Sequence, residues 1–241
     1  GPVQWRSQGA IAAEHTLHVD EVTYGFGGIQ TGPVFNATPQ LSFHPAVGGA
    51  VTTLEREFYY AEGNVGLTVQ GRYSSVSSAL RLRSGYREYG DQVTGDQGYY
   101  AEAIGTVLIP SIIASKDYVV VNPWYRLSEI EGTVTNFLNQ EIQPGRYREW
   151  GGEIGYYWEF IQDLTIGPSV IGRQRVFDQE VLPNDHRKDD YFSPGITATL
   201  GHMFECSCEL EIDYRYRINR SNDNDIDYDG HRATISVTSR L

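Results

Sequence analysis

The C-terminal stretch from residue 209 to residue 241 constrains the fold most strongly, because its apolar and polar side chains alternate. One face of an extended strand would carry the apolar residues Leu210, Ile212, Tyr214, Tyr216 and Ile218. The other face would carry only ionisable residues, namely Glu209, Glu211, Asp213, Arg215 and Arg217. A soluble β-sandwich buries its apolar face and leaves loosely spaced charges in water. An unbroken ionisable face instead predicts a polar interior and an apolar exterior, which is typical of a transmembrane β-barrel.

The same period-two pattern recurs along the chain. Apolar and polar faces alternate around residues 35–43, 65–73, 80–87, 119–127, 150–159, 164–175 and 232–241. The alternation is less regular near Ile11, Val51, Ala101 and Ile196. We therefore predict an all-β fold: a transmembrane, antiparallel, up-and-down β-barrel of about 12 strands, with short periplasmic turns and longer extracellular loops.

The connections between these runs suggest an orientation in the membrane. Short turns are predicted at residues 45–48, 74–77, 115–117, 161–163 and 205–208, and long polar loops at residues 128–148, 178–190 and 219–230. Outer-membrane barrels keep their short turns on the periplasmic side. An even number of strands then places both termini in the periplasm.

Length and composition fit a single β domain. The chain has 241 residues, of which 26 are Gly and 17 are Tyr, a composition that favours strands and turns over helices. No stretch approaches the ~20 consecutive apolar residues that a membrane-spanning helix needs. Residues 1–2, Gly1-Pro2, resemble the scar that a protease leaves on a recombinant protein, so residues 3–241 form the predicted barrel domain. We expect that a targeting segment has been removed, with or without an upstream periplasmic domain.

A family resemblance rests on the last third of the chain. The residues that carry it run from Tyr214 to Arg217, from Asn219 to Asn222 and from Asp227 to Arg232, followed by alternation to the C-terminus. On this pattern the whole chain resembles Gram-negative outer-membrane β-barrels, and its last third is similar to barrels associated with exopolysaccharide export and to β-barrel porin families. The resemblance implies a place in the bacterial outer membrane, contact with lipid and lipopolysaccharide, and periplasmic export machinery as a partner.

Arginine dominates the predicted inward face. The chain has 17 Arg and two Lys, and the arginines expected to face the lumen are Arg72, Arg81, Arg83, Arg87, Arg126, Arg173, Arg175, Arg215, Arg217 and Arg232. Guanidinium binds carboxylate and phosphate through two parallel donors and also stacks on aromatic planes. Trp124 and Tyr157 are placed to stack on sugar rings, and Glu153, Glu209, Glu211 and Asp213 share the same wall. This pattern predicts a pore for the passive passage or export of anionic oligosaccharide or polysaccharide, without a cofactor.

Two alternatives remain open at this stage. Interior carboxylates could pair with the arginines and close the lumen of a structural or adhesive barrel; the candidates are Glu55, Glu57, Glu102, Glu153, Glu159, Glu209, Glu211 and Asp213. A rim-active lipid hydrolase would need a Ser nucleophile and a His base near the outer rim. The candidates are His186 with Ser193, and His231 with Ser221 and Asp229, but neither set carries a local catalytic motif, so no enzyme activity is predicted.

The remaining charge is predicted to lie in the loops. A formal net charge of -12 argues against nucleic acid as a partner and suits loops that face the divalent cations held by lipopolysaccharide. The run from Asp225 through Asp227 to Asp229 and Gly230 resembles the start of a calcium loop. Ser236 stands where the closing Glu would be, so a solvated acidic loop is predicted and no metal site. Cys206 and Cys208 are predicted to be turn residues.

Overall fold

The computed structural model describes residues 4–15, 23–54, 57–90, 97–132, 134–135, 141–142, 145–182, 185–203, 208–223 and 227–239. These residues form β-strands and their connections. The strands are β1 (Gln4–His15), β2 (Thr23–Thr38), β3 (Leu41–Leu54), β4 (Glu57–Tyr73), β5 (Val76–Tyr89), β6 (Gln97–Pro110), β7 (Asp117–Ile130), β8 (Val134–Thr135), β9 (Glu141–Ile142), β10 (Arg146–Ile161), β11 (Leu164–Leu182), β12 (Asp185–Met203), β13 (Cys208–Ser221) and β14 (Tyr228–Ser239).

Twelve of these strands form one antiparallel, up-and-down sheet. Its order is β1-β2-β3-β4-β5-β6-β7-β10-β11-β12-β13-β14, and β8 pairs only with β9 in the connection between β7 and β10. The predicted all-β fold with twelve up-and-down strands is therefore confirmed. Among the described residues there is no helix long and apolar enough to cross a membrane.

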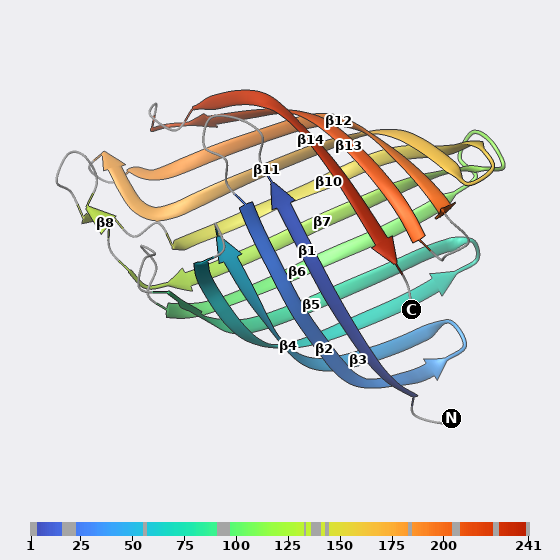
Figure 1. The fold of residues 1–241 in the computed structure, drawn as a ribbon, viewed down its shortest axis with the longest axis horizontal. Coiled ribbons are helices and arrows are strands. Elements are labelled where there is room, and N and C mark those ends of the chain that lie inside the picture. The colour runs from blue at the N-terminus through green and yellow to red at the C-terminus, as the bar shows by residue number, and fades with distance from the viewer. Residues whose placement is uncertain are drawn as a thin grey trace.

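The sheet is strongly curved, so that it has a concave and a convex face. In Figure 1 it bends round until its two end strands, β1 and β14, come to the same side of the molecule. Contacts between strands that are not neighbours show which side chains lie on the concave face. Arg215 of β13 lies 2.7 Å from Glu153 of β10, although β11 and β12 lie between these strands in the sheet. The fold is thus barrel-like.

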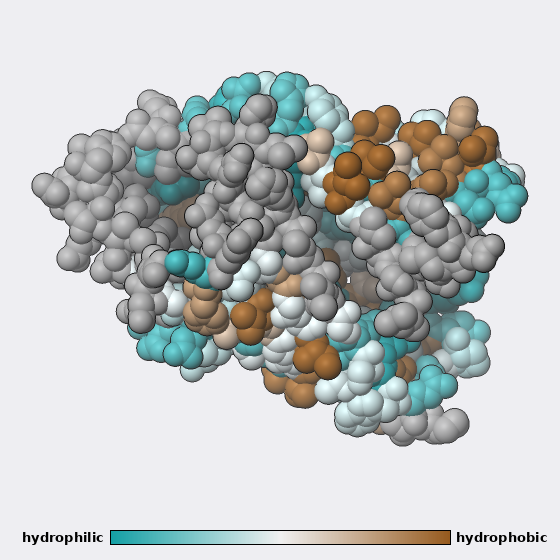
Figure 2. Space-filling view, in the orientation of Figure 1, coloured by the Kyte–Doolittle hydropathy of each residue, from teal (hydrophilic) through white to brown (hydrophobic). Residues whose placement is uncertain are grey.

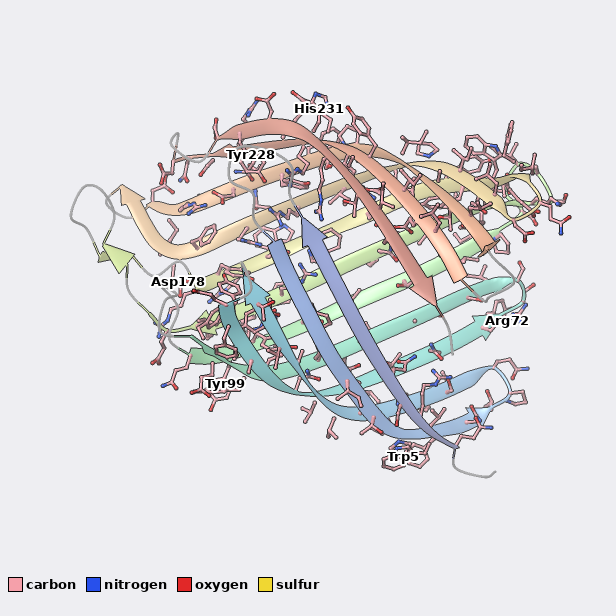
Figure 3. All side chains as sticks on the ribbon, viewed as in Figure 1. Trp5, Arg72, Tyr99, Asp178, Tyr228 and His231 are labelled. Atoms are coloured by element: carbon pink, nitrogen blue, oxygen red, sulfur yellow. The ribbon has the colours of Figure 1, made fainter. Side chains whose placement is uncertain are left out.

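The convex face is apolar. Large hydrophobic side chains are exposed on nearly every strand of the sheet, for example Trp5 at 69% and Ile235 at 70%. Trp5 and Tyr99 point away from the ribbon in Figure 3, and in Figure 2 hydrophobic side chains gather on the outer surface over β13 and β14.

Most of the buried side chains, by contrast, are polar. The buried apolar residues among those described are Val34, Ala50, Tyr100, Ile130 and Phe177. The buried polar and charged residues are His44, Thr52, Glu62, Asn64, Glu102, Asp117, Ser128, Glu149, Ser169, Asp189, Ser193, Thr197 and Asn219. This distribution is the inverse of that in a soluble domain.

The two ends of the sheet differ. We call the end at which β1 begins and β14 stops the turn end, and the opposite end the loop end. At the turn end, successive strands are joined by residues 39–40, 74–75, 111–116 and 162–163, and β12 ends at Met203 while β13 begins at Cys208. Ser74, Ser111 and Asp163 in these turns have positive φ angles of 53°, 57° and 64°, the left-handed conformation that tight turns use.

Connections at the loop end vary in length. Residues 16–22, 90–96, 131–145 and 222–227 separate consecutive strands of the sheet at this end, whereas residues 55–56 and 183–184 separate others by only two positions. The predicted loops at 128–148 and 219–230 are centred on two of the longer separations. The predicted loop at residues 178–190 is wrong, because β11 continues to Leu182 and β12 begins at Asp185. These strand ends carry charged residues without a clear alternation, so their sequence resembles a loop although their backbone stays paired.

The predicted turn at residues 45–48 is also wrong, because these residues lie inside β3. Pro45 lacks an N–H donor, which normally excludes proline from the interior of a sheet. Here the ladder between β2 and β3 is interrupted: pairing stops at Thr31 with Val47 and resumes at Phe35 with Phe43. Gly32 lies in this gap, where a Cβ atom would come within 2.0 Å of the carbonyl oxygen of Pro45.

Candidate functional site

A belt of alternating charges crosses the concave face near the loop end. We call it the charge belt. Its members are Glu62 of β4, Arg83 and Arg87 of β5, Glu102 of β6, Arg126 of β7, Glu149 of β10, and Arg173 and Arg175 of β11. Most contacts join residues directly opposite each other in neighbouring strands, such as Glu62 with Arg87 and Glu149 with Arg175. Opposite charges at such positions stabilise strand pairing.

Glu149 is the most enclosed member of the belt, with 0% of its surface exposed. Its Oε1 accepts hydrogen bonds from Trp124 Nε1 at 3.0 Å and from Arg126 Nη1 at 3.1 Å. Its Oε2 accepts two more from Arg175, from Nε at 2.9 Å and from Nη2 at 2.5 Å, and Arg173 Nη1 lies 3.6 Å away. A buried carboxylate is tolerated when charged donors surround both of its oxygens in this way.

Glu62 organises the other end of the belt. It accepts hydrogen bonds from Arg87 Nε at 2.8 Å and from Arg83 Nη1 at 3.3 Å. Arg83 Nε also lies 2.9 Å from Glu102 Oε1, although its N–H is not directed at that oxygen. The guanidinium carbon of Arg87 lies 4.3 Å from the ring centroid of Tyr100, a cation–π contact that helps to fix the arginine.

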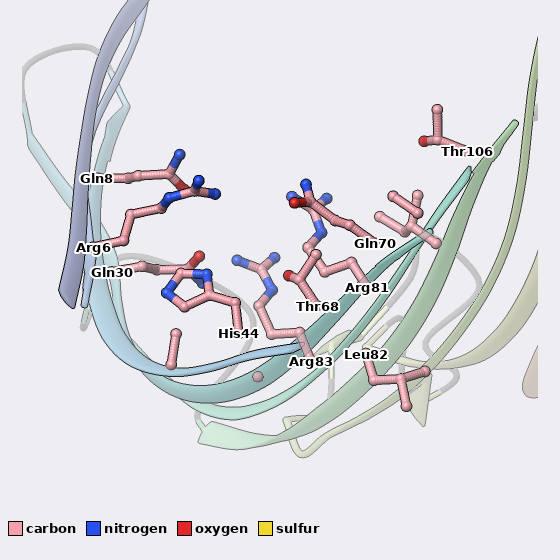
Figure 4. A pocket seen from close by; sticks show the side chains of 14 residues that line it. Arg6, Gln8, Gln30, His44, Thr68, Gln70, Arg81, Leu82, Arg83 and Thr106 are labelled. Atoms are coloured by element: carbon pink, nitrogen blue, oxygen red, sulfur yellow. The ribbon is translucent and has the colours of Figure 1, made fainter. Parts of the chain in front are cut away.

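A cavity that we call the arginine pocket lies on the concave face between the charge belt and the turn end. Its volume is about 290 Å³. The polar side chains that line it are Arg6, Gln8, Gln30, His44, Thr68, Gln70, Arg81, Arg83 and Thr106. Figure 4 shows these side chains converging from β1 to β6 on the inside of the curved sheet. No Asp or Glu of the described chain lines the pocket. Of its three arginines, Arg83 forms ion pairs with Glu62 and Glu102 of the charge belt, whereas Arg6 and Arg81 have none within the described residues.

A larger cavity of about 990 Å³ occupies the turn end of the other half of the sheet. We call it the acidic cavity. It is lined by Lys116, Asp117, Glu153, Tyr157, Glu159, Asp163, Glu209, Glu211, Asp213, Arg215, Arg217 and Arg232 together with uncharged residues. Within it, Arg215 bridges Glu153 at 2.7 Å and Asp213 at 2.8 Å. Among the described residues, no group of three or more His, Cys, Asp or Glu side chains could hold a metal ion.

The structure brings the residues predicted to line the lumen into these regions. Those in or beside the charge belt are Arg83, Arg87, Trp124, Arg126, Arg173 and Arg175. Those in the acidic cavity are Glu153, Tyr157, Glu209, Glu211, Asp213, Arg215, Arg217 and Arg232. Arg81 lies in the arginine pocket, and Arg72 lies beside Gln70 in a neighbouring cavity of about 400 Å³ at the turn end.

Sequence reasoning missed Arg6, His44, Glu62 and Glu149. Glu149 follows directly on a segment predicted to be a loop, and His44 adjoins a predicted turn that proved to be strand. The alternation of inward and outward side chains along β1 would have identified Arg6, because Arg6 and Gln8 face the pocket while Trp5 points outward. The carboxylates expected on the interior are only partly paired with arginines: Glu102, Glu153 and Asp213 are, Glu159 pairs with Lys116, and Glu55 lies outside the described residues.

The residues considered for a lipid hydrolase are not assembled as a catalytic group. His186 and Ser193 are seven residues apart on β12, which corresponds to roughly 23 Å along an extended strand. His231 Nδ1 lies 2.6 Å from the hydroxyl of Tyr214, whereas the hydroxyl of Ser221 donates to Asp189.

The features predicted for the loops lie partly outside the described residues. Asp225 and Cys206 are outside, and Cys208 is the first residue of β13. Asp227 accepts a hydrogen bond from the backbone N–H of Ser221 and so helps to hold the connection between β13 and β14.

Comparison with known proteins adds no relative. No protein-family model, curated protein or solved structure matches this chain. The function must therefore be argued from the surfaces described above.

Proposed function

We propose that this protein is a closed outer-membrane β-barrel that lets anionic saccharides pass through an arginine-lined lumen. The observation that carries the proposal is the arginine pocket: Arg6 and Arg81 face a polar cavity whose described lining contains no carboxylate. Guanidinium groups that no protein carboxylate neutralises attract anions from solution.

The membrane part of the proposal rests on the distribution of polarity. Apolar side chains cover the convex face, whereas most buried side chains are polar. Soluble monomers rarely expose contiguous apolar patches larger than a few hundred Å². A lipid bilayer around the convex face would remove these apolar side chains from water and leave the polar concave face as the lumen.

Closure would require β1 to pair with β14. Both strands have 12 residues, and the up-and-down order makes them antiparallel. Their concave-facing residues are polar on both strands, including Gln8 on β1 and Thr234 on β14. Pairing is also expected energetically, because unpaired backbone N–H and C=O groups are costly in lipid.

Two neighbouring cavities with polar lining residues support passage along the part of the lumen between the turn end and the charge belt. The arginine pocket and the cavity beside Arg72 share Gln70 and Thr106, so polar side chains extend from the turn end toward the charge belt. Arg72, Arg81 and Arg83 succeed one another along this path. An anion moving inward would meet successive guanidinium groups rather than one tight site.

The charge belt favours a second candidate function, a structural barrel. Glu149 is fully enclosed among Arg126, Arg173 and Arg175, so this part of the concave face is neutralised by the protein itself. If such pairs filled the lumen, the barrel would be stable but would not conduct.

Single-channel current through the purified protein in a planar bilayer tests the pore proposal. We expect stable current steps, a reversal potential under a KCl gradient that indicates preference for chloride, and transient block by added oligogalacturonate. The Arg6→Gln/Arg81→Gln double variant should lose most of the anion preference. The control is Arg148→Gln, which removes an exposed charge of β10 that lines neither the arginine pocket nor the acidic cavity, and this variant should keep the preference. A folded, heat-modifiable barrel without conductance would contradict the pore and favour the structural barrel.

A further inference from the structure

We propose that the arginine pocket is a specific binding site for one anionic group of an acidic saccharide, held by Arg6, Arg81 and the ring of His44. This inference rests on the proposed function, because it assigns the position within the lumen at which the saccharide is bound. The sequence analysis did not assign Arg6 or His44 to the lumen.

The charge of the pocket is the first argument. The side chains of Arg6 and Arg81 have no hydrogen bond or ion pair within the described part of the chain, in contrast to Arg83, which contacts both Glu62 and Glu102. Arginine stays protonated in proteins, so the pocket cannot become neutral by losing a proton. No carboxylate in the described lining of the pocket offsets this charge, although Arg81 also lines a neighbouring cavity that Glu62 borders. Two guanidinium forks suit the oxygens of a carboxylate or a phosphate ester.

His44 is the second, independent argument. Only 9% of its surface is exposed, and its Nε2 has no hydrogen-bond partner in the described structure. In Figure 4 its ring lies among the pocket residues, near Gln30 and Arg83. A buried polar atom without a hydrogen-bond partner destabilises a fold. An Nε2–H that donates to a bound anion would satisfy this atom.

The uncharged lining explains why a saccharide fits better than a bare ion. Gln8, Gln70 and Thr68 present amide and hydroxyl groups to the same space. Gln30 is held in place, because its Nε2 donates to Asn64 Oδ1 at 3.1 Å and Asn64 in turn donates to Glu62. Such groups can donate to or accept from sugar hydroxyls. The volume of about 290 Å³ is close to the lower end of the range for small-molecule sites, so the pocket suits a single sugar unit.

Isothermal titration of the folded, detergent-solubilised protein tests the site. The probes are trigalacturonate, glucose 6-phosphate and the neutral galactotriose, so that the carboxylate and phosphate arms are separate. We expect at least one acidic sugar to bind and galactotriose not to bind. Arg6→Gln and Arg81→Gln should each weaken that binding by about tenfold or more, the effect of losing a charge-assisted hydrogen bond. Arg148→Gln is the matched control and should bind as the wild type does.

His44→Leu separates binding from folding. Replacing an unpartnered buried nitrogen with a carbon side chain should leave stability unchanged or raised, but it should weaken binding of the acidic sugar by about fivefold or more. The site is overturned if all variants bind as the wild type does, or if galactotriose binds equally well. Anion-selective conductance with unchanged binding in these variants would reject this site but not the pore. Binding that these variants weaken, in a protein that does not conduct, would support the site and reject the pore.

Discussion

At the scale of single residues, the belt carboxylates differ from the surface ion pairs in how far they are exposed to solvent. Glu149 has no exposed surface and forms ion pairs with three arginines of the two neighbouring strands, β7 and β11. Lys116 and Glu159, in contrast, form a 3.0 Å pair in which 63% and 31% of the side chains are exposed. Solvent screens the pair of Lys116 and Glu159. Glu149 and Glu159 therefore allow a buried and an exposed ion-paired carboxylate to be compared in the same protein.

Glu149→Gln should lower the free energy of unfolding by about 3 kcal/mol. The change keeps the shape of the side chain but leaves Arg126, Arg173 and Arg175 without their shared counter-charge. The arginine side chains that contact Glu149 remain 25–40% exposed, so solvent can partly stabilise them when the carboxylate is lost. The expected loss therefore lies at the lower end of the roughly 3–5 kcal/mol that breaking a buried ion pair costs. Urea unfolding followed by heat-modifiable gel mobility measures the loss.

The control for this experiment is Glu159→Gln, whose cost should stay below about 1 kcal/mol because its partner is a solvated lysine. Equal stability of both variants would mean that the belt does not hold the strands together.

At the scale of elements, the connection between β6 and β7 is built around one carboxylate. The side chain of Asp117 accepts hydrogen bonds from the backbone N–H groups of Ile112, Ile113 and Ala114 at 2.7–2.8 Å, and from the hydroxyl of Tyr156 at 2.8 Å. Burial alone would raise the pKa of Asp117, but these donors outweigh it and lower the pKa below its usual value. The turn therefore depends on an ionised Asp117.

The rigidity of this turn should depend on pH. Because the pKa of Asp117 is lower in the folded protein than in the unfolded chain, its contribution is complete above the unfolded value of about 3.9 and is lost as the pH falls through the folded value. The protection factors of the amides of residues 112–114, which compare the observed exchange rate with the intrinsic rate at the same pH, should be high at neutral pH and should fall in strong acid.

Asp117→Asn provides the comparison, since a neutral amide accepts these N–H groups more weakly. The variant should show lower protection factors at neutral pH and no further fall of these factors in acid at this turn. If wild type and variant exchanged alike at neutral pH, the carboxylate would not be what holds the turn.

At the scale of the whole molecule, the proposed seam between β1 and β14 decides whether the curved sheet is a closed barrel. Ser7 and Trp5 of β1 lie on the convex face, opposite Gln8, and Ala233 and Ile235 of β14 lie on the convex face, opposite Thr234. A closed barrel would bring the convex positions of the two strands into one continuous outer surface.

Cysteine cross-linking should detect the seam. In a background with Cys206→Ser and Cys208→Ser, we expect Ser7→Cys to form a disulfide with one of His231→Cys, Ala233→Cys and Ile235→Cys after mild oxidation in liposomes. Thr234→Cys, on the opposite face, should not react. Ser7→Cys with Thr31→Cys serves as the positive control, because these residues are directly paired in β1 and β2. If the control cross-links while no β14 position does, the seam is open.

The fold followed from the sequence to a large extent, because the side-chain period of a strand is local. The alternation of Leu210 with Glu211 predicts a strand and its two faces without knowledge of any neighbour. The positions of Pro45 and of the charged residues 178–190 were not predictable in this way. Whether a proline or a charged run stays in a strand depends on the partner strand, here on the gap at Gly32 and on the pairing of β11 with β12.

The sequence by itself determined that the chain forms about twelve antiparallel strands with an apolar and an arginine-rich face, since these properties depend only on period and composition. The tertiary structure decided which arginines are neutralised. Glu62, Glu102 and Glu149 reach their arginines because strand register places them directly opposite, whereas the arginine pocket, which Arg6 and Arg81 line, has no carboxylate in its described lining. Register and curvature are long-range properties, so the division between a neutralised belt and a positively charged pocket became visible only in the folded sheet.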